Sequence, residues 1–296
     1  MKRRIDLMTP PKYLTAGSVE EALSLLSQYG EKAKFVSGGT DFLMQLKRGE
    51  AVPECLISLG EIRELDFIKY DEINGLRIGA LTTIVNVAKA SLIQSKFSIL
   101  AQAAGMLGTP AIRNQATLGG NLCNAAPSAD TAPPLLVLGA MAKTAGMEGE
   151  KIVPLEDFFV GPGQTILGQD RLLTEIQIPN MLPHSGGAYL KQKRRQGADL
   201  AVVGVAALVV MEEEVLKDVK IALGAVAPIP IRARKAEEIL RGRKLDQRLL
   251  EKSGHAASDE AKPIDDIRGS ADYRRQLVAV LTKRTITQAI QQAEGR

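Results

Sequence analysis

The sequence contains no tryptophan, and only two cysteines and two histidines among its 296 residues. Cys55 and Cys123 are far apart, and no Cys-x-x-Cys spacing is present. This scarcity excludes a disulfide framework and an iron–sulfur cluster held by cysteines alone. It is typical of proteins from a reducing compartment, so we predict a cytoplasmic location.

The residues that usually carry acid–base or metal chemistry are also scarce. His184 and His255 have no neighbouring ligand pattern, which argues against a catalytic histidine or a zinc site. There is no Gly-x-Ser-x-Gly elbow, no phosphate-binding P-loop and no Gly-x-Gly-x-x-Gly fingerprint; GPGQTILG (161–168) has the wrong spacing and no helix after it. A chain so poor in reactive side chains is expected to take its chemistry from a cofactor.

Composition gives little support for nucleic-acid or membrane binding. The net charge is +4, but basic residues are interspersed with nearly as many acidic ones, and aromatic residues make up only 4%. Stacking platforms for bases are therefore sparse. The basic start, MKRR, is followed by no apolar run, and no window is long and apolar enough to span a bilayer. We expect no nucleic-acid partner, no export signal and no membrane span.

The apolar pattern of the first fifty residues predicts one β-α-β unit. Ser18 and Glu21 have the spacing of a capping box, and an apolar stripe follows them up to a helix stop at Gly30. AKFV (33–36) and ECLISL (54–59) are predicted buried strands.

The rest of the chain mixes strands and helices and then ends in helices. Strands are predicted at 76–81, 172–179, 201–211 and 219–226, the last two in an antiparallel sheet, and helices at 83–92, 98–107, 129–139, 234–240, 246–257 and 272–293. Pro133 and Pro134 are compatible with their helix only in its first turn. The last helix is predicted to bury Leu277, Val280, Leu281 and Ile286.

Two glycine-rich stretches stand out, FVSGGTDFL (35–43) and ATLGGNLCNAAPSAD (116–130). Glycine permits close approach to the backbone, and successive peptide N–H groups can form a nest for an anion. We predict that both stretches are loops that end strands, and that together they hold a dinucleotide diphosphate with main-chain donors and the Thr40 and Thr117 hydroxyls. The alternative is that each is an ordinary tight turn.

These stretches resemble the FAD-binding subunits of the molybdenum hydroxylases, such as the medium subunit of carbon monoxide dehydrogenase and the flavin part of xanthine dehydrogenase. The family pattern is approximately G-G-T-[DE]-[LI], then T-[IL]-G-G-N with an aspartate nine residues after the asparagine; Asn121 and Asp130 have that spacing. Further similarity lies at 108–121, 189–206, 224–233 and 272–281, so it covers essentially the whole chain.

The resemblance implies an α+β fold. An FAD-binding domain of the vanillyl-alcohol-oxidase (PCMH) type would occupy residues 1–178, as two α/β subdomains of about 1–55 and 56–178. A C-terminal domain at 183–296, a small antiparallel sheet with helices, would follow, with the flavin between them.

The resemblance also implies which residues bind FAD. Asp130 would be a polar contact, Leu173 would pack on the isoalloxazine ring, and Lys191 would be the basic contact near the ring and favour the negatively charged reduced flavin. Lys193 is the alternative, and a solvated basic face is the structural alternative for the whole cluster. The remaining residues that the resemblance implies are Val36, Ser37, Gly38, Gly39, Thr40, Asp41, Phe42, Leu43, Leu107, Thr117, Leu118, Gly119, Gly120 and Asn121.

The resemblance finally implies an oxidoreductase subunit without catalytic residues or metal ligands of its own. Electrons would come from two [2Fe-2S] clusters on a small partner subunit and a molybdopterin centre on a large one, in a dimer of heterotrimers. They would pass through FAD to NAD⁺, a quinone or oxygen. Two other functions are open: a stand-alone flavin oxidase and a flavin-binding module without turnover.

Overall fold

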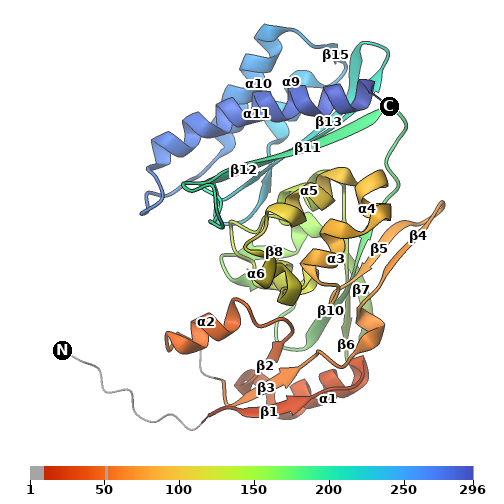
Figure 1. Cartoon of the computed structure of the whole chain (residues 1–296), viewed down its shortest axis with the longest axis vertical. Helices are drawn as coiled ribbons and strands as arrows, with labels where there is room; N and C mark the ends of the chain where they lie inside the picture. The colour runs from red at the N-terminus through yellow and green to blue at the C-terminus, as the bar shows by residue number, and fades with distance from the viewer. Residues whose placement is uncertain (1–9, 51–52, 296) are drawn as a thin grey trace.

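The computed structural model describes residues 10–50 and 53–295. Three lobes, each built on its own sheet, are stacked along the long axis of the molecule (Figure 1). The N-terminal residues behind the prediction of no export signal lie outside the described part. Within that part, no helix has both the length and the apolar character needed to cross a membrane.

The N-terminal lobe is a three-stranded parallel sheet of order β1-β3-β2. Its elements are β1 (Lys12–Thr15), α1 (Val19–Tyr29), η1 (Gly30–Lys32), β2 (Ala33–Val36), α2 (Phe42–Lys47) and β3 (Cys55–Ser58). The Ser18 hydroxyl accepts from the Glu21 amide at 3.1 Å, and the Glu21 carboxylate accepts from the Gly17 amide at 2.7 Å. The predicted β-α-β unit and the Ser18 cap are confirmed, but the Glu21 carboxylate bonds the amide of Gly17 and not that of the N-cap residue, so the box is not the standard one.

The middle lobe is an antiparallel sheet of order β4-β5-β10-β6-β7, with short helices on one side. Its elements are η2 (Arg63–Leu65), β4 (Ile68–Asp71), β5 (Gly75–Gly79), α3 (Ile84–Lys89), α4 (Ser91–Lys96), α5 (Ser98–Met106), α6 (Pro110–Gln115), α7 (Leu118–Cys123), α8 (Ala132–Val137), β6 (Met141–Gly146), β7 (Gly149–Pro154), η3 (Leu155–Asp157) and β10 (Arg171–Ile178), with the hairpin of β8 (Phe159–Gly161) and β9 (Gln164–Thr165). Pro133 lies in the first turn of α8, as predicted.

The second glycine stretch departs from its prediction. It does not end a strand; it forms the short helix α7, which follows α6. The Thr117 hydroxyl caps this helix by accepting from the Gly120 amide at 3.0 Å. Glycine disfavours helices on its own, but this N-cap and the burial of Leu118 and Leu122 override that preference.

The C-terminal lobe is an antiparallel sheet covered by helices. Its elements are β11 (Ser185–Gln192), β12 (Val203–Glu212), β13 (Val215–Gly224), β14 (Ile231–Arg232), α9 (Arg234–Leu240), β15 (Arg243–Lys244), α10 (Gln247–Glu260) and α11 (Ala271–Glu294). Strand β12 is buried on both faces: Val205 and Val209 join the core of this lobe, whereas Ala206 and Leu208 join the core of the middle lobe. Because successive side chains of a β-strand point to opposite faces, β12 packs into both cores and so connects the two lobes.

The long helix α11 runs along this sheet (Figure 1). Leu281 and Ile286 are buried there as predicted, but Val280 is 38% exposed. The prediction was wrong for Val280 because the buried face follows Val278, Leu281 and Thr285, at helical spacing, and Val280 lies off it.

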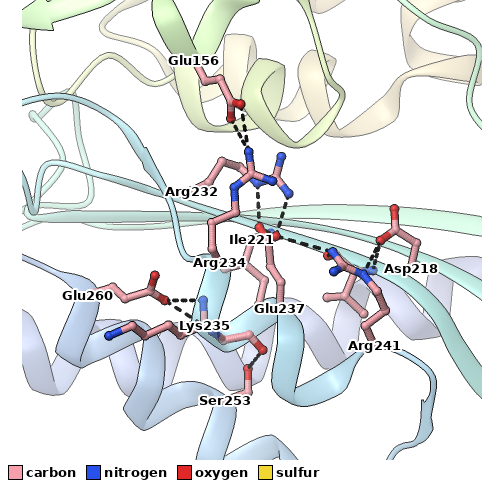
Figure 2. Close-up of polar contacts among 12 residues, drawn as sticks. Glu156, Asp218, Ile221, Arg232, Arg234, Lys235, Glu237, Arg241, Ser253 and Glu260 are labelled. Carbon is pink, nitrogen blue, oxygen red and sulfur yellow. Dashed lines mark hydrogen bonds and ion pairs between the residues drawn. The ribbon is translucent and has the colours of Figure 1, made fainter.

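An ion-pair cluster holds α9 against the sheet (Figure 2). The fully buried Glu237 carboxylate accepts from two guanidinium nitrogens of Arg232, at 2.6 and 2.8 Å, and from the Ile221 amide at 2.9 Å. Nearby, Arg234 pairs with Glu156 of the middle lobe at 2.8 Å. The α+β class is confirmed, with the lobes tied by charged as well as apolar contacts.

Candidate functional site

A cavity of about 1000 Å³ is lined by residues of all three lobes. Both glycine stretches contribute to its wall, although they are about eighty residues apart in the chain. The Ser37 and Thr117 hydroxyls are hydrogen-bonded at 3.1 Å, which joins the two segments directly. The volume of the cavity lies at the upper end of the range for small-molecule sites, as a dinucleotide requires.

Glycine is necessary where these segments meet. A β-carbon on Gly38 would lie 1.9 Å from the Gln115 carbonyl oxygen, and one on Gly119 would lie 2.7 Å from Ala80. A β-carbon on Gly120 would lie 2.9 Å from both the Ser37 and the Thr117 hydroxyl oxygens. The glycines therefore serve first to let protein segments approach one another.

The first segment also exposes main-chain donors. The backbone N–H groups of residues 37–42 donate to no acceptor among the described residues. They form a continuous run between the end of β2 and the first residue of α2. Gly39 makes this path possible, because its φ of +68° is in the left-handed region. A succession of amides without a protein acceptor is what an anion nest requires, and the sequence predicts such a nest here.

The second segment does not expose such donors, and this part of the prediction was wrong. The amides of Leu118 and Gly119 donate to the Thr82 and Ala80 carbonyls, each at 2.9 Å. The Gly120 amide donates to the Thr117 hydroxyl, and the Asn121 amide to the Thr117 carbonyl at 3.0 Å. Helix formation uses these groups, so the second segment contributes shape and side chains in place of bare amides.

Most of the predicted site residues line the cavity, and four do not. Those that line it are Ser37, Gly38, Gly39, Thr40, Asp41, Phe42, Leu107, Thr117, Gly119, Gly120, Asn121, Asp130 and Leu173. Val36 and Leu118 are buried in the protein behind it, Leu43 is 46% exposed, and the Lys191 side chain is buried outside the lining.

Asp130 and Lys191 form a buried ion pair between the middle and C-terminal lobes. Lys191 Nζ lies 2.7 Å from Asp130 Oδ2, and the Tyr189 hydroxyl donates to Asp130 Oδ1 at 2.9 Å. Burial raises the pKa of the Asp130 carboxyl, while Lys191 and Tyr189 oppose that rise. Opposite charges so close present little net charge to the cavity. Lys193 instead donates to the Gln196 and Gly197 carbonyls of its own turn.

Side chains that the sequence did not single out complete the wall. Leu26 and Leu59 of the N-terminal lobe, and Leu172 of β10, which packs into the same hydrophobic cluster, give it an apolar part. The apolar sequence segments that contain these leucines predicted a hydrophobic core, and nothing in those segments indicated that the leucines would also line a cavity. Cys123 also lines the cavity, but burial raises the pKa of its thiol to about 12. The thiol stays protonated at neutral pH and is no nucleophile.

No group of three or more histidine, cysteine or acidic side chains in the described ranges is arranged to hold a metal ion. The wall combines amides that have no acceptor among the described residues with hydroxyls and apolar surfaces, a set that suits a large ligand with an anionic part.

Comparison with known families decides which ligand. Residues 7–181 match the FAD binding domain in molybdopterin dehydrogenase, and residues 188–289 match the CO dehydrogenase flavoprotein C-terminal domain. The chain belongs to the family of FAD-binding subunits of the molybdenum hydroxylases. The family, as recognised from the glycine stretches, is confirmed.

Relatives of this flavoprotein family match along nearly their whole length. The chain is 32% identical to the xanthine dehydrogenase FAD-binding subunit of Escherichia coli O157:H7, covering 96% of this chain and 97% of that protein. It is 32% identical to the carbon monoxide dehydrogenase medium chain of Hydrogenophaga pseudoflava, covering 95% and 98%. A solved structure of carbon monoxide dehydrogenase from Hydrogenophaga pseudoflava superposes with a TM-score of 0.92 at 33% identity, covering 95% of this chain and 98% of that chain.

Proposed function

We propose that this chain binds FAD in the cavity and acts as the electron-transfer flavoprotein subunit of a molybdenum hydroxylase. The observation that carries the proposal is the run of six amides at 37–42 that have no acceptor among the described residues, at the wall of a cavity large enough for a dinucleotide, in a chain of this family. FAD supplies the redox chemistry, because a flavin takes up electrons singly and passes them on singly or in pairs.

The residues of the chain bind and orient the cofactor. The amides of 37–42 would donate to the diphosphate oxygens, and the Thr40 hydroxyl and the Asn121 side-chain nitrogen, which have no partner among the described residues, are additional donors. Leu107 and Leu173 offer apolar surface for a flat ring. The Asp130–Lys191 ion pair would hold the C-terminal lobe against the middle lobe beside the cavity.

The partners follow from the family. We propose a small subunit with [2Fe-2S] clusters as electron donor and a large molybdopterin subunit as the site of substrate oxidation, assembled as a dimer of heterotrimers in the cytoplasm. Neither histidine nor tyrosine is among the described residues that line the cavity. This counts against a stand-alone oxidase that uses a histidine or a tyrosine as its substrate base.

Purification of the untagged protein from its native source tests the subunit assignment. The chain is expected to elute with two further polypeptides, with flavin absorbance at about 450 nm and with iron and molybdenum in the same fractions. Reduction of the flavin by substrate should require all three polypeptides, and the chain separated from them is the control. Elution of the chain alone, with a flavin that no partner reduces, would contradict the assignment.

A further inference from the structure

The turn between β11 and β12 brings the C-terminal lobe to the cavity. Ala198, Asp199 and Leu200 line it, and no other described residue of the β11–α11 lobe does so. The turn is exposed to solvent: Leu200, which lines the cavity, is 53% exposed, and the side chain of Arg195, beside it in the turn, is 73% exposed. A bound group at this part of the cavity is therefore within reach of other proteins.

One carboxylate oxygen of Asp199 accepts no hydrogen bond from the described residues. Its side chain is only 9% exposed, and its Oδ1 accepts a hydrogen bond from the Leu200 amide at 3.0 Å. Its Oδ2 is shielded from solvent and accepts no hydrogen bond in the described structure. The nearest cationic atoms are Nε of Arg195 at 3.8 Å and Nε of Arg194 at 3.9 Å, beyond hydrogen-bond distance. An unpaired buried carboxylate oxygen costs stability and calls for a ligand donor.

FAD carries both acceptors and donors, and they are unevenly distributed. The diphosphate and the ring carbonyls are acceptors, which a carboxylate repels. The donors of the flavin half are the ring N3–H and the ribityl hydroxyls. The flavin half is also the one that must exchange electrons with partners, so it belongs at the exposed turn 198–200, away from the apolar wall formed by the N-terminal lobe.

We propose that Asp199 binds the flavin half of FAD, its carboxylate accepting a hydrogen bond from the ring N3–H or from a ribityl hydroxyl. The inference rests on the proposed function and adds a contact from the C-terminal lobe. The Nε atoms of Arg194 and Arg195, at 3.9 and 3.8 Å from Asp199 Oδ2, hold the carboxylate beside the cavity.

Calorimetric titration of the cofactor-free full-length chain with FAD and with ADP tests the proposal. ADP carries the diphosphate and the adenosine of FAD without the flavin. Asp199→Ala is expected to raise the FAD dissociation constant at least tenfold, the effect of one charge-assisted hydrogen bond, and to leave ADP binding unchanged. Asp199→Asn, which keeps one acceptor oxygen, should show a smaller loss.

Asp218→Asn is the matched control. Asp218 also accepts the amide of the next residue at 3.0 Å and pairs with an arginine, Arg241, but it does not line the cavity (Figure 2). The Asp218→Asn variant should bind FAD with wild-type affinity. Wild-type FAD affinity in Asp199→Ala, equal losses for FAD and ADP, or a markedly lower melting temperature of the cofactor-free variant would overturn the proposal. Failure of the wild-type chain to bind FAD would overturn the proposed function as well.

Discussion

Replacing Gly39 with valine is expected to weaken FAD binding by at least a hundredfold. Gly39 has a φ of +68°, a conformation that costs a residue with a side chain about 1–2 kcal/mol. A β-branched residue there would turn the backbone and redirect the amides on either side. Loss of two charge-assisted hydrogen bonds, about 1.5–3 kcal/mol each, exceeds a hundredfold in the dissociation constant. Titration of the cofactor-free chain with FAD measures the effect.

The chain offers a matched control for that experiment. Gly49 has a φ of +70°, and a β-carbon there would meet no atom within 4 Å. Gly49 does not line the cavity. Gly49→Val carries the same backbone strain and should reduce stability by a similar amount without changing FAD affinity. Equal FAD affinities for the two variants would show that the first segment does not hold the cofactor.

Replacing Lys191 with methionine is expected to destabilise the protein by about 3–5 kcal/mol, the usual cost of leaving one charge of a buried pair without its partner. The Lys191 side chain is 2% exposed and the Asp130 side chain 6%. Urea unfolding of the cofactor-free chain measures the change in the free energy of unfolding. The double variant Asp130→Asn with Lys191→Met, which is neutral, should recover most of the loss. Lys217→Met, at an exposed pair with Glu212, should change stability by less than about 1 kcal/mol.

The loss in Lys191→Met should depend on pH. Burial raises the pKa of Asp130 in the folded state, and removal of the lysine removes the largest opposing charge. Between the unfolded pKa of about 3.9 and the raised folded value, the folded state binds more protons, so the variant gains stability relative to wild type as pH falls through this window. The double variant, which lacks the carboxylate, should show no such gain. A loss that is independent of pH would show that Asp130 is not the group left unpaired.

The sequence was most informative where local chemistry determines local structure. The Ser18 cap of the first helix, the strand that ends at Val36 and the antiparallel strands of the C-terminal lobe follow from short-range patterns, and all are confirmed. The backbone path at 37–42, with amides that have no acceptor among the described residues, was predictable for the same reason, since it depends on Gly39 and on its position after a strand.

The rest of the site depends on tertiary contacts that no short-range pattern contains. The amides of the second glycine stretch are used by the Ala80 and Thr82 carbonyls and by helix α7. Lys191 was predicted as a contact of the ring, but its charge is paired with Asp130, sixty-one residues away. Asp199 was overlooked because it follows a run of basic residues, and only the folded turn brings it to the cavity.

Amide hydrogen exchange at single-residue resolution, with and without FAD, tests the central claim most directly. The amides of 37–42, which have no acceptor in the described part of the chain, should exchange rapidly in the cofactor-free chain and slow at least tenfold when FAD is saturating. The amides of 118–121, already bonded within the protein, should exchange slowly in both states. Rapid exchange at 37–42 with FAD bound would contradict the account.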